Sequence, residues 1–292
     1  MIVFYFCLTY FFIIGLTLID AAITLKPKSP KISTITAAAA APQKRSFLRS
    51  YEVATKDYIL VFGDSITEYG GLPDGFVTKL VEAYKDKLDV IDLGYGGHNA
   101  QNARSEALPS TIPHYNPANK TAPSPRLIIV EFGTNDSIIE GFKGHLPLPK
   151  YVENLRAIYD DFMNPKSPYY APRGKVMFVT PGPLGLRMWN NNRGFDTEDT
   201  PVERDNDRVI LYGETLKALA KKLDNAPVAD FYSSMSEAIK WLPDVYKQTK
   251  YKGFEHYFKD GVHLNPEGNV VMFETIMNTI KREMPELLPE NL

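Results

Sequence analysis

Short apolar runs alternate with longer amphipathic segments along most of the chain after residue 57. Each run consists mainly of aliphatic, aromatic or β-branched residues and is followed by glycine, proline or polar turn residues, which is typical of buried strands. The pattern predicts strands at residues 58–62, 90–93, 127–132, 175–180 and 227–230.

The amphipathic segments carry apolar residues at a spacing of three or four. They predict helices at residues 75–87, 99–108, 148–163, 202–223, 233–241 and 266–282. Short buried strands that alternate with helices indicate an α/β fold, in which helices cover both faces of a parallel sheet. We expect a three-layer, doubly wound sheet of flavodoxin-like strand order 2-1-3-4-5, with its site beyond the carboxyl ends of the strands.

Two long stretches, residues 109–125 and 181–200, are predicted to be irregular. Long loops in a compact domain are often functional, so we expect these two to wall the substrate pocket. The alternative is that they are plain surface loops.

The first residues differ from the rest of the chain. Residues 2–19 carry no charged side chain, and as a helix they would span about 27 Å, close to the thickness of a bilayer core. They are either a signal peptide or a single membrane anchor. The lysines within 26–31 favour a cytosolic side for the residues after the apolar segment, whereas Lys44-Arg45 resembles a processing site of the secretory pathway. We therefore expect entry into the secretory pathway or membrane anchoring, with the topology open.

Composition sets limits on the remainder. We divide the 292 residues into an apolar segment (1–22), a linker of low order with prolines and an alanine run (23–56), and one globular domain (57–292). The net charge of −2 gives no electrostatic case for a nucleic-acid partner. The single cysteine, Cys7, allows neither an intramolecular disulfide nor a cysteine-based metal site.

The strongest chemical signal is Gly63-Asp64-Ser65, directly after the first predicted strand. A strand, a tight turn and a helix would deliver Ser65 to a helix N-terminus, where backbone N–H groups stabilise negative charge. The same tripeptide is also ordinary turn chemistry. Far along the chain, Asp260 and His263 are spaced so that the carboxylate contacts one ring nitrogen and the other acts as a general base.

Two further loops would meet Ser65 at the same sheet edge. The predicted strand 127–132 ends in a turn that contains Asn135, whose amide is a candidate oxyanion donor. The strand 90–93 ends in a glycine-rich loop, in which Gly97 offers a backbone N–H.

These four blocks resemble the SGNH, or GDSL-like, hydrolase superfamily, whose blocks contribute Ser, Gly, Asn and His in that chain order. Residues 62–68, the loop of residues 94–99 and the stretch 260–268 resemble the isoamyl-acetate-hydrolysing esterase subgroup. The resemblance covers roughly residues 57–282. One departure is Ile66, where many members carry leucine; both are apolar and would pack under the turn.

The resemblance implies a catalytic triad of Ser65 as nucleophile, His263 as general base and Asp260 as the residue that orients His263. It implies an oxyanion hole made by Ser65 N–H, Gly97 and Asn135, with no metal or cofactor. The expected substrates are small carboxylic esters, acetates of short alcohols in particular.

Other functions remain open from the sequence. The same fold would serve an esterase of acylated carbohydrates or lipids. A two-metal phosphoesterase needs several paired His and Asp ligands, and no His-x-His or Asp-x-His pair occurs. An inactive binding module would usually have lost Ser65, Asp260 or His263. Membrane association through residues 2–19 is a further expectation.

The proposed boundaries make a direct prediction. A protein that begins at Ser46 should fold and keep the activity of the full chain, because the core and the candidate site lie beyond residue 57. Circular dichroism and ester hydrolysis by residues 46–292 check this. A truncated protein that does not fold would refute the linker boundary.

Overall fold

The computed structural model describes residues 54–112, 114, 116, 119, 121–194, 202–240 and 253–292. The chain divides into two units, 1–44 and 45–292, and every described residue belongs to the second. The predictions for residues 1–22 and for most of the linker 23–56 lie outside the described residues. Within the described part, no helix is both long enough and apolar enough to cross a membrane.

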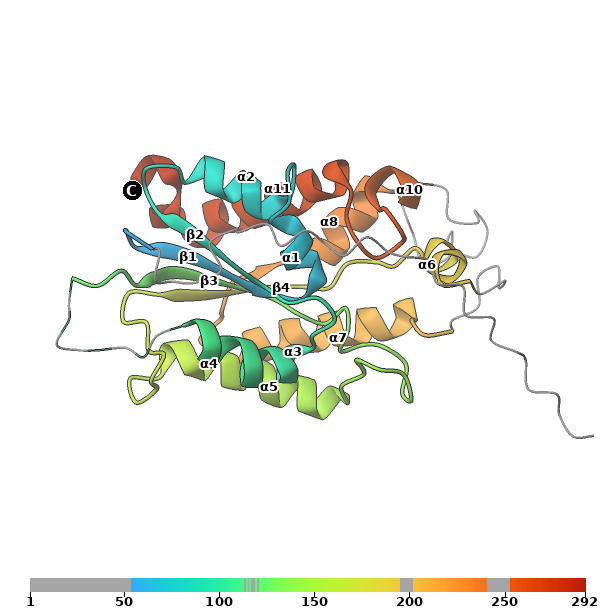
Figure 1. The fold of residues 1–292 in the computed structure, drawn as a ribbon, viewed down its shortest axis with the longest axis horizontal. Helices are drawn as coiled ribbons and strands as arrows, with labels where there is room; N and C mark the ends of the chain where they lie inside the picture. The colour runs from blue at the N-terminus through green and yellow to red at the C-terminus, as the bar shows by residue number, and fades with distance from the viewer. Residues whose placement is uncertain are drawn as a thin grey trace, which may run out of the picture. The chain divides into compact units, whose positions relative to one another are not determined.

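A five-stranded parallel sheet forms the centre of this unit (Figure 1). Its strand order is 2-1-3-4-5, which confirms the predicted topology. Each predicted strand is present within one or two residues of its expected ends. The strands are β1 (Tyr58–Gly63), β2 (Asp89–Gly94), β3 (Pro125–Glu131), β4 (Lys175–Val179) and β5 (Val228–Ala229).

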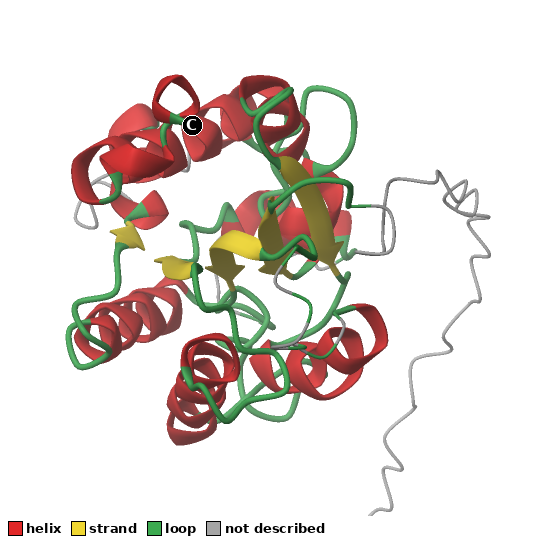
Figure 2. Cartoon of the chain, turned by 90° about the vertical axis from the view of Figure 1, so that its left-hand side faces the viewer, coloured by secondary structure: helices red, strands yellow, loops and turns green. Residues whose placement is uncertain are grey.

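Helices cover both faces of the sheet, as the views in Figures 1 and 2 agree. Successive strand residues point to opposite faces, so Leu60 and Phe62 join one core and Ile59 and Val61 the other. One face packs against α3 (Ala100–Asn102), a π-helical turn (Ala103–Ala107), α4 (Leu108–Thr111), α5 (Leu148–Met163) and α7 (Asn206–Ala220). The other packs against α2 (Phe76–Ala83), α8 (Phe231–Ala238), α10 (Phe254–Tyr257), α11 (Pro266–Glu283) and a short 3₁₀ turn (Pro285–Leu287).

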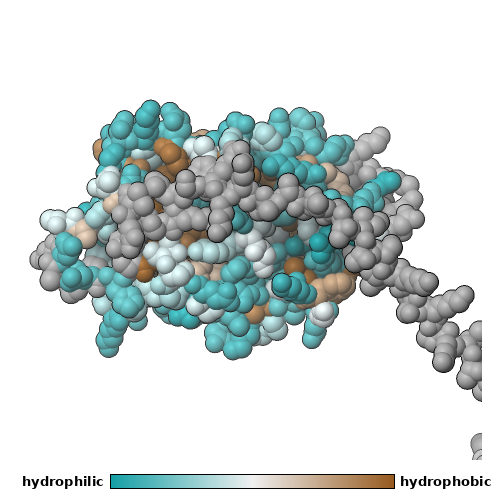
Figure 3. Space-filling view, in the orientation of Figure 1, coloured by the Kyte–Doolittle hydropathy of each residue, from teal (hydrophilic) through white to brown (hydrophobic). Residues whose placement is uncertain are grey.

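Polar side chains dominate the described part of the face drawn in Figure 3. On the part of the face in Figure 3 that is not grey, apolar residues are scattered among hydrophilic ones. This distribution fits two cores that are closed inside the helical layers, with strand residues such as Leu60 and Ile59 fully buried.

The structure corrects the prediction that residues 181–200 are irregular. Helix α6 (Leu186–Asn192) lies within that stretch. Leu186 and Trp189 are one helical turn apart and pack with Val209 and Val262 in a small separate core. The helix escaped prediction because three apolar residues beside an asparagine run do not establish a helical period.

Several helix boundaries also differ: α2, for example, ends at Ala83 rather than at residue 87. Helix α7 begins at Asn206 rather than at residue 202, because the Asp205 side chain accepts the N–H of Asp207 and caps it there. The helix predicted at 99–108 is interrupted by the π-helical turn and continues as α4 into the stretch 109–125, which was expected to be irregular.

Three carboxyl groups are buried where β1 and β3 end: Asp64, Glu131 and Asp136. Asp64 accepts the N–H of Ile66, and Asp136 accepts the N–H groups of Ala100 and Gly133. The side chain of Glu131 accepts the Thr67 hydroxyl.

Burial disfavours the charged form of all three groups. It raises the pKa of Asp64 to about 6 and that of Asp136 to about 7. The pKa of Glu131 is well above its ordinary value, through burial first and then through repulsion from Asp64.

These shifts predict that the protein is more stable at pH 5 than at pH 8. In the unfolded chain the three carboxyls ionise near pH 4, so between there and about pH 7 the folded state holds more protons and loses stability as the pH rises. Urea unfolding midpoints at the two pH values check this. Asp64→Asn, which removes one of the three groups, should reduce the difference. A midpoint that rises between pH 5 and pH 8 would contradict the argument.

Candidate active site

The candidate site is built from loops that meet at the carboxyl edge of the sheet. Parallel pairing sets Gly63 at the end of β1 opposite Gly94 of β2 and Glu131 of β3. The loops that begin after these three residues therefore start side by side. They carry Ser65, Gly97 and Asn135, three of the residues predicted for the site.

A tight turn delivers Ser65. Asp64 caps α1 (Ser65–Gly70) by accepting the N–H of Ile66 at 2.8 Å, so Ser65 is the first residue of the helix. A Cβ at Gly63 would lie 2.1 Å from Thr67 Oγ1 and 2.8 Å from the carbonyl oxygen of Glu131. Only glycine fits at that point of the turn.

His263 and Asp260 reach Ser65 from the loop before α11. Ser65 Oγ lies 2.9 Å from His263 Nε2, and His263 Nδ1 lies 2.6 Å from Asp260 Oδ2. The structure thus brings together the three side chains predicted for the triad, although Ser65 and His263 are 198 residues apart. The loop is tied to the start of α6 by the N–H of Gly185, which donates to the carbonyl of Gly261.

The second carboxylate oxygen of Asp260 is also occupied. Asp260 Oδ1 accepts the N–H groups of Val262 and His263. Burial opposes ionisation, but the hydrogen bonds from His263 and Val262 and the attraction to His263 together outweigh it and lower the pKa of Asp260. An ionised Asp260 favours the proton on Nδ1, which leaves Nε2 as the acceptor for the Ser65 hydroxyl.

Two aromatic rings flank the imidazole. The ring of Tyr69 lies 4.9 Å from that of His263, and the ring of Trp189 lies 6.2 Å from it. Trp189 belongs to the stretch 181–200, so this part of the stretch adjoins the site as expected. Tyr69 is 40% exposed, whereas Trp189 is buried.

The glycine-rich loop lies next to Ser65. A Cβ at Gly96 would be 3.8 Å from Ser65 Cβ, and the Gly96 N–H is held by Glu68 Oε2 at 2.9 Å. Gly97 has φ +76°, a conformation that favours glycine, although a Cβ there would meet nothing within 4 Å. Among the described residues, no hydrogen bond takes up the Gly97 N–H.

The Asn135 amide is held by its surroundings. Its Nδ2 donates to the carbonyl of His98 at 2.9 Å and, at a longer 3.3 Å, to Asp64 Oδ2. His98 follows Gly97 in the chain, and Asp64 precedes Ser65. The three residues predicted for the oxyanion hole therefore lie close together. Its Oδ1 accepts Arg204 Nη2 at 3.0 Å.

Arg204 is a residue of the site that the sequence does not predict. It lies just before α7 inside a segment predicted as an amphipathic helix, where an arginine indicates the solvent face. In the structure it is 5% exposed. Nothing in the local pattern signals a buried arginine.

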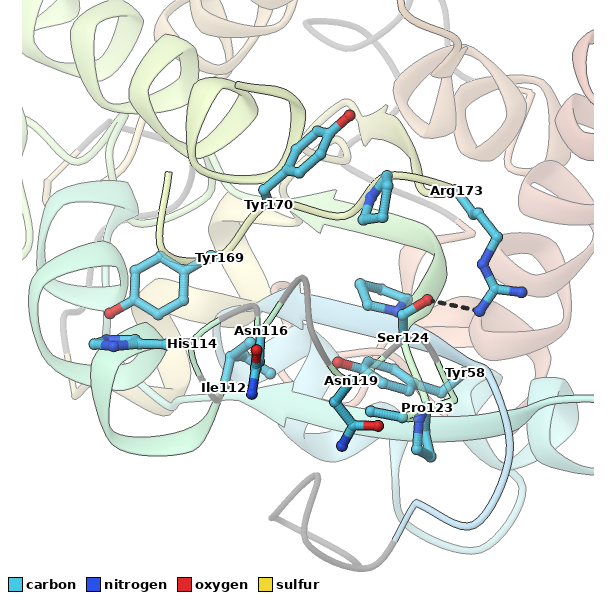
Figure 4. A pocket seen from close by; sticks show the side chains of 13 residues that line it. Tyr58, Ile112, His114, Asn116, Asn119, Pro123, Ser124, Tyr169, Tyr170 and Arg173 are labelled. Atoms are coloured by element: carbon cyan, nitrogen blue, oxygen red, sulfur yellow. Dashed lines mark hydrogen bonds between the residues drawn. The ribbon is translucent and has the colours of Figure 1, made fainter. Parts of the chain in front are cut away.

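A separate cavity of about 570 Å³ lies at the other edge of the sheet (Figure 4). It is lined by Tyr58 and Pro125, the first residues of β1 and β3, and by side chains such as His114, Tyr169 and Arg173. Eight described residues of the stretch 109–125 line this cavity, from Ile112 to Pro125, so these eight do not wall the catalytic pocket as expected. The reason is that they lead into the amino end of β3.

The described side chains offer no metal centre. Among them, no group of three or more His, Cys, Asp or Glu residues is arranged to hold a metal ion.

Comparison with known proteins shows the family of the chain. Residues 61–271 match the GDSL-like lipase/acylhydrolase family. A GDSL esterase/lipase of Arabidopsis thaliana is 29% identical over 239 residues, which cover 79% of this chain and 89% of the relative. The isoamyl acetate-hydrolyzing esterase of Schizosaccharomyces pombe is 28% identical over 263 residues, or 90% of this chain and 89% of the relative.

Among solved structures, an acetyl xylan esterase superimposes with a TM-score of 0.54 at 18% identity, over 76% of this chain and 99% of the esterase. At that identity the likeness shows the shared fold. The family match covers more than half of the chain and contains the strand ends that meet at Ser65. The chain belongs to the GDSL-like lipase/acylhydrolase family and is a carboxylic ester hydrolase.

Proposed function

We propose that the protein is a serine esterase that hydrolyses small carboxylic esters through Ser65, His263 and Asp260. The observation that carries the proposal is the pair of hydrogen bonds of 2.9 and 2.6 Å that joins the three side chains. A serine hydroxyl is a weak nucleophile at neutral pH, and an adjacent base that takes its proton activates it.

Acylation follows from this arrangement. His263 Nε2 removes the Ser65 proton as Oγ attacks the ester carbonyl carbon. Asp260 stabilises the imidazolium that forms and keeps Nε2 directed at the reaction. The tetrahedral intermediate then collapses, the bond to the alcohol oxygen breaks, and the imidazolium returns its proton to the leaving alcohol.

Deacylation uses the same groups. A water molecule gives a proton to Nε2 while its oxygen attacks the acyl-Ser65 carbonyl carbon. The second tetrahedral intermediate releases the carboxylic acid, and Ser65 regains its proton from His263.

The developing oxyanion is stabilised by the N–H groups of Ser65 and Gly97 and by Asn135 Nδ2. Support comes from the convergence of the three residues and from the Gly97 N–H, which no other described residue accepts. Asn135 has one strong acceptor in the His98 carbonyl and one long contact of 3.3 Å to Asp64. In the proposed reaction the oxyanion takes the place of Asp64 Oδ2 as an acceptor for Asn135 Nδ2, while the hydrogen bond to the His98 carbonyl remains.

Acetates of short alcohols are the substrates that we propose. The relatives named for isoamyl acetate hydrolysis, in Schizosaccharomyces pombe and in mammals, support this choice because they match this chain over most of their own length. Esters of acetylated carbohydrates, as in the structural relative named above, or of lipids are the alternatives. No cofactor takes part in the proposed reaction.

Replacement of Ser65 tests the proposal. Ser65→Ala should lower kcat for p-nitrophenyl acetate by about 10⁴ to 10⁶, because it removes the nucleophile and leaves only binding and the oxyanion hole. Ser105→Ala, at an exposed serine, is the matched control and should keep full activity. Turnover should be unaffected by EDTA and should fall from acetate to longer acyl chains.

Three outcomes would contradict the proposal. Activity that survives Ser65→Ala would remove Ser65 from the reaction. Activity that EDTA abolishes would favour a metal-dependent hydrolase. A preference for octanoate over acetate would assign the site to longer acyl groups.

A further inference from the structure

Arg204 is buried directly behind Asn135. Its Nη1 donates to the carbonyl of Thr134 at 2.7 Å, and its Nη2 donates to Asn135 Oδ1 at 3.0 Å. The guanidinium lies over the ring of Trp189, 4.7 Å from the ring centroid. A buried arginine is usually paired, and here one of its two hydrogen-bond partners is the amide proposed to bind the oxyanion.

The contacts leave the amide of Asn135 only one acceptable orientation. Its oxygen faces a guanidinium donor, and its nitrogen faces the His98 carbonyl. A flip of the amide would set –NH₂ against the guanidinium and oxygen against oxygen, so that donors would face donors and acceptors would face acceptors. The oxyanion hole needs the –NH₂ side toward Ser65, and this is the side that Arg204 keeps there.

The charge of Arg204 also favours donation by Asn135 Nδ2. Burial lowers its pKa, while the neighbouring acids Glu203, Asp64 and Asp260 raise it, and an arginine stays protonated in proteins. A cation bound to the amide oxygen draws electron density from the nitrogen, which strengthens each N–H as a donor. This cation is buried over the Trp189 ring, so its field is weakly screened.

We propose that Arg204 is a positioning residue that holds and polarises the Asn135 amide so that Nδ2 donates to the oxyanion. The proposal rests on the oxyanion role proposed above for Asn135. The competing view is that Arg204 only braces the loop after β3 through the Thr134 carbonyl.

The chain offers a matched control for that view. Arg208, one turn further along in α7, braces the same loop by donating to the carbonyls of Ser137 and Ile138. It does not hydrogen-bond Asn135. Loss of bracing alone should therefore affect Arg204 and Arg208 variants in the same way.

Kinetics of the full chain with p-nitrophenyl acetate separate the two views. Arg204→Met should lower kcat by about 10- to 100-fold, less than the 10² to 10³ typical for loss of an oxyanion donor itself, with KM changed by less than about 3-fold. Arg204→Lys should recover part of kcat, because an ammonium reaches one of the two acceptors. Arg208→Met should leave kcat within about 3-fold of the wild type.

A double-mutant cycle gives the sharper result. If Arg204 acts through Asn135, then Arg204→Met combined with Asn135→Ala should be no slower than Asn135→Ala alone. Multiplied effects in the double variant would overturn the proposal. So would equal losses in Arg204→Met and Arg208→Met, or a change confined to KM.

The cycle also distinguishes this proposal from the one on which it rests. An Asn135→Ala variant with full kcat would refute the oxyanion role, whereas a slow Asn135→Ala beside an unimpaired Arg204→Met would refute only the role of Arg204. Thermal unfolding establishes that each variant is folded. If Arg204→Met does not fold, Arg204→Lys carries the test, and failure of both to fold would overturn the proposal, since Arg204 would then serve the fold.

Discussion

The parallel pairing of β1 with β2 and β3 is the constraint on which the site depends. It sets Gly63 between Gly94 and Glu131, so that three chain segments leave the sheet at one level. Because a slip in register would turn each strand's core residues to the wrong face, this alignment is held by the two cores on either side of the sheet. The candidate active site therefore inherits its geometry from hydrophobic packing some distance away.

Beneath the site, the interior is polar and carries charge. Asp64, Glu131, Asp136 and Arg204 are all buried there, and most of their hydrogen bonds go to the backbone or side chains of the loops that bear the site. Burial of such groups opposes stability unless they are well paired. The raised pKa values of Asp64 and Asp136 indicate that burial disfavours their charged forms. These groups therefore hold the loops in place at a cost in folding stability. An oxyanion hole requires donors that are already in position before the reaction, and these buried groups hold the loops that carry them.

Much of the fold was accessible from the sequence. Strand β1 and residues 127–130 of β3 are continuous apolar runs, and helix α5 has its predicted ends because five apolar residues mark one face of it. The grouping of Ser65 with Asn135 could also be foreseen, since the rules of parallel sheets bring strand ends together, whereas His263 was assigned through its spacing to Asp260 and the resemblance to SGNH hydrolases. The features that could not be foreseen depend on tertiary contacts: α6 is stabilised by Val209 and Val262, and Arg204 is buried by Trp189 and Asn135. The spacing of apolar residues within one segment of the sequence reveals neither the helix α6 nor the burial of Arg204.

The central claim is that Ser65 is an activated nucleophile, and covalent labelling tests it most directly. The full chain would be treated with a fluorophosphonate, which phosphonylates activated serine hydroxyl groups, and the modified residue would be located by mass spectrometry of its peptides. The account predicts one adduct, on Ser65, and its loss or marked slowing in His263→Ala. An unmodified Ser65, or labelling that does not depend on His263, would contradict it.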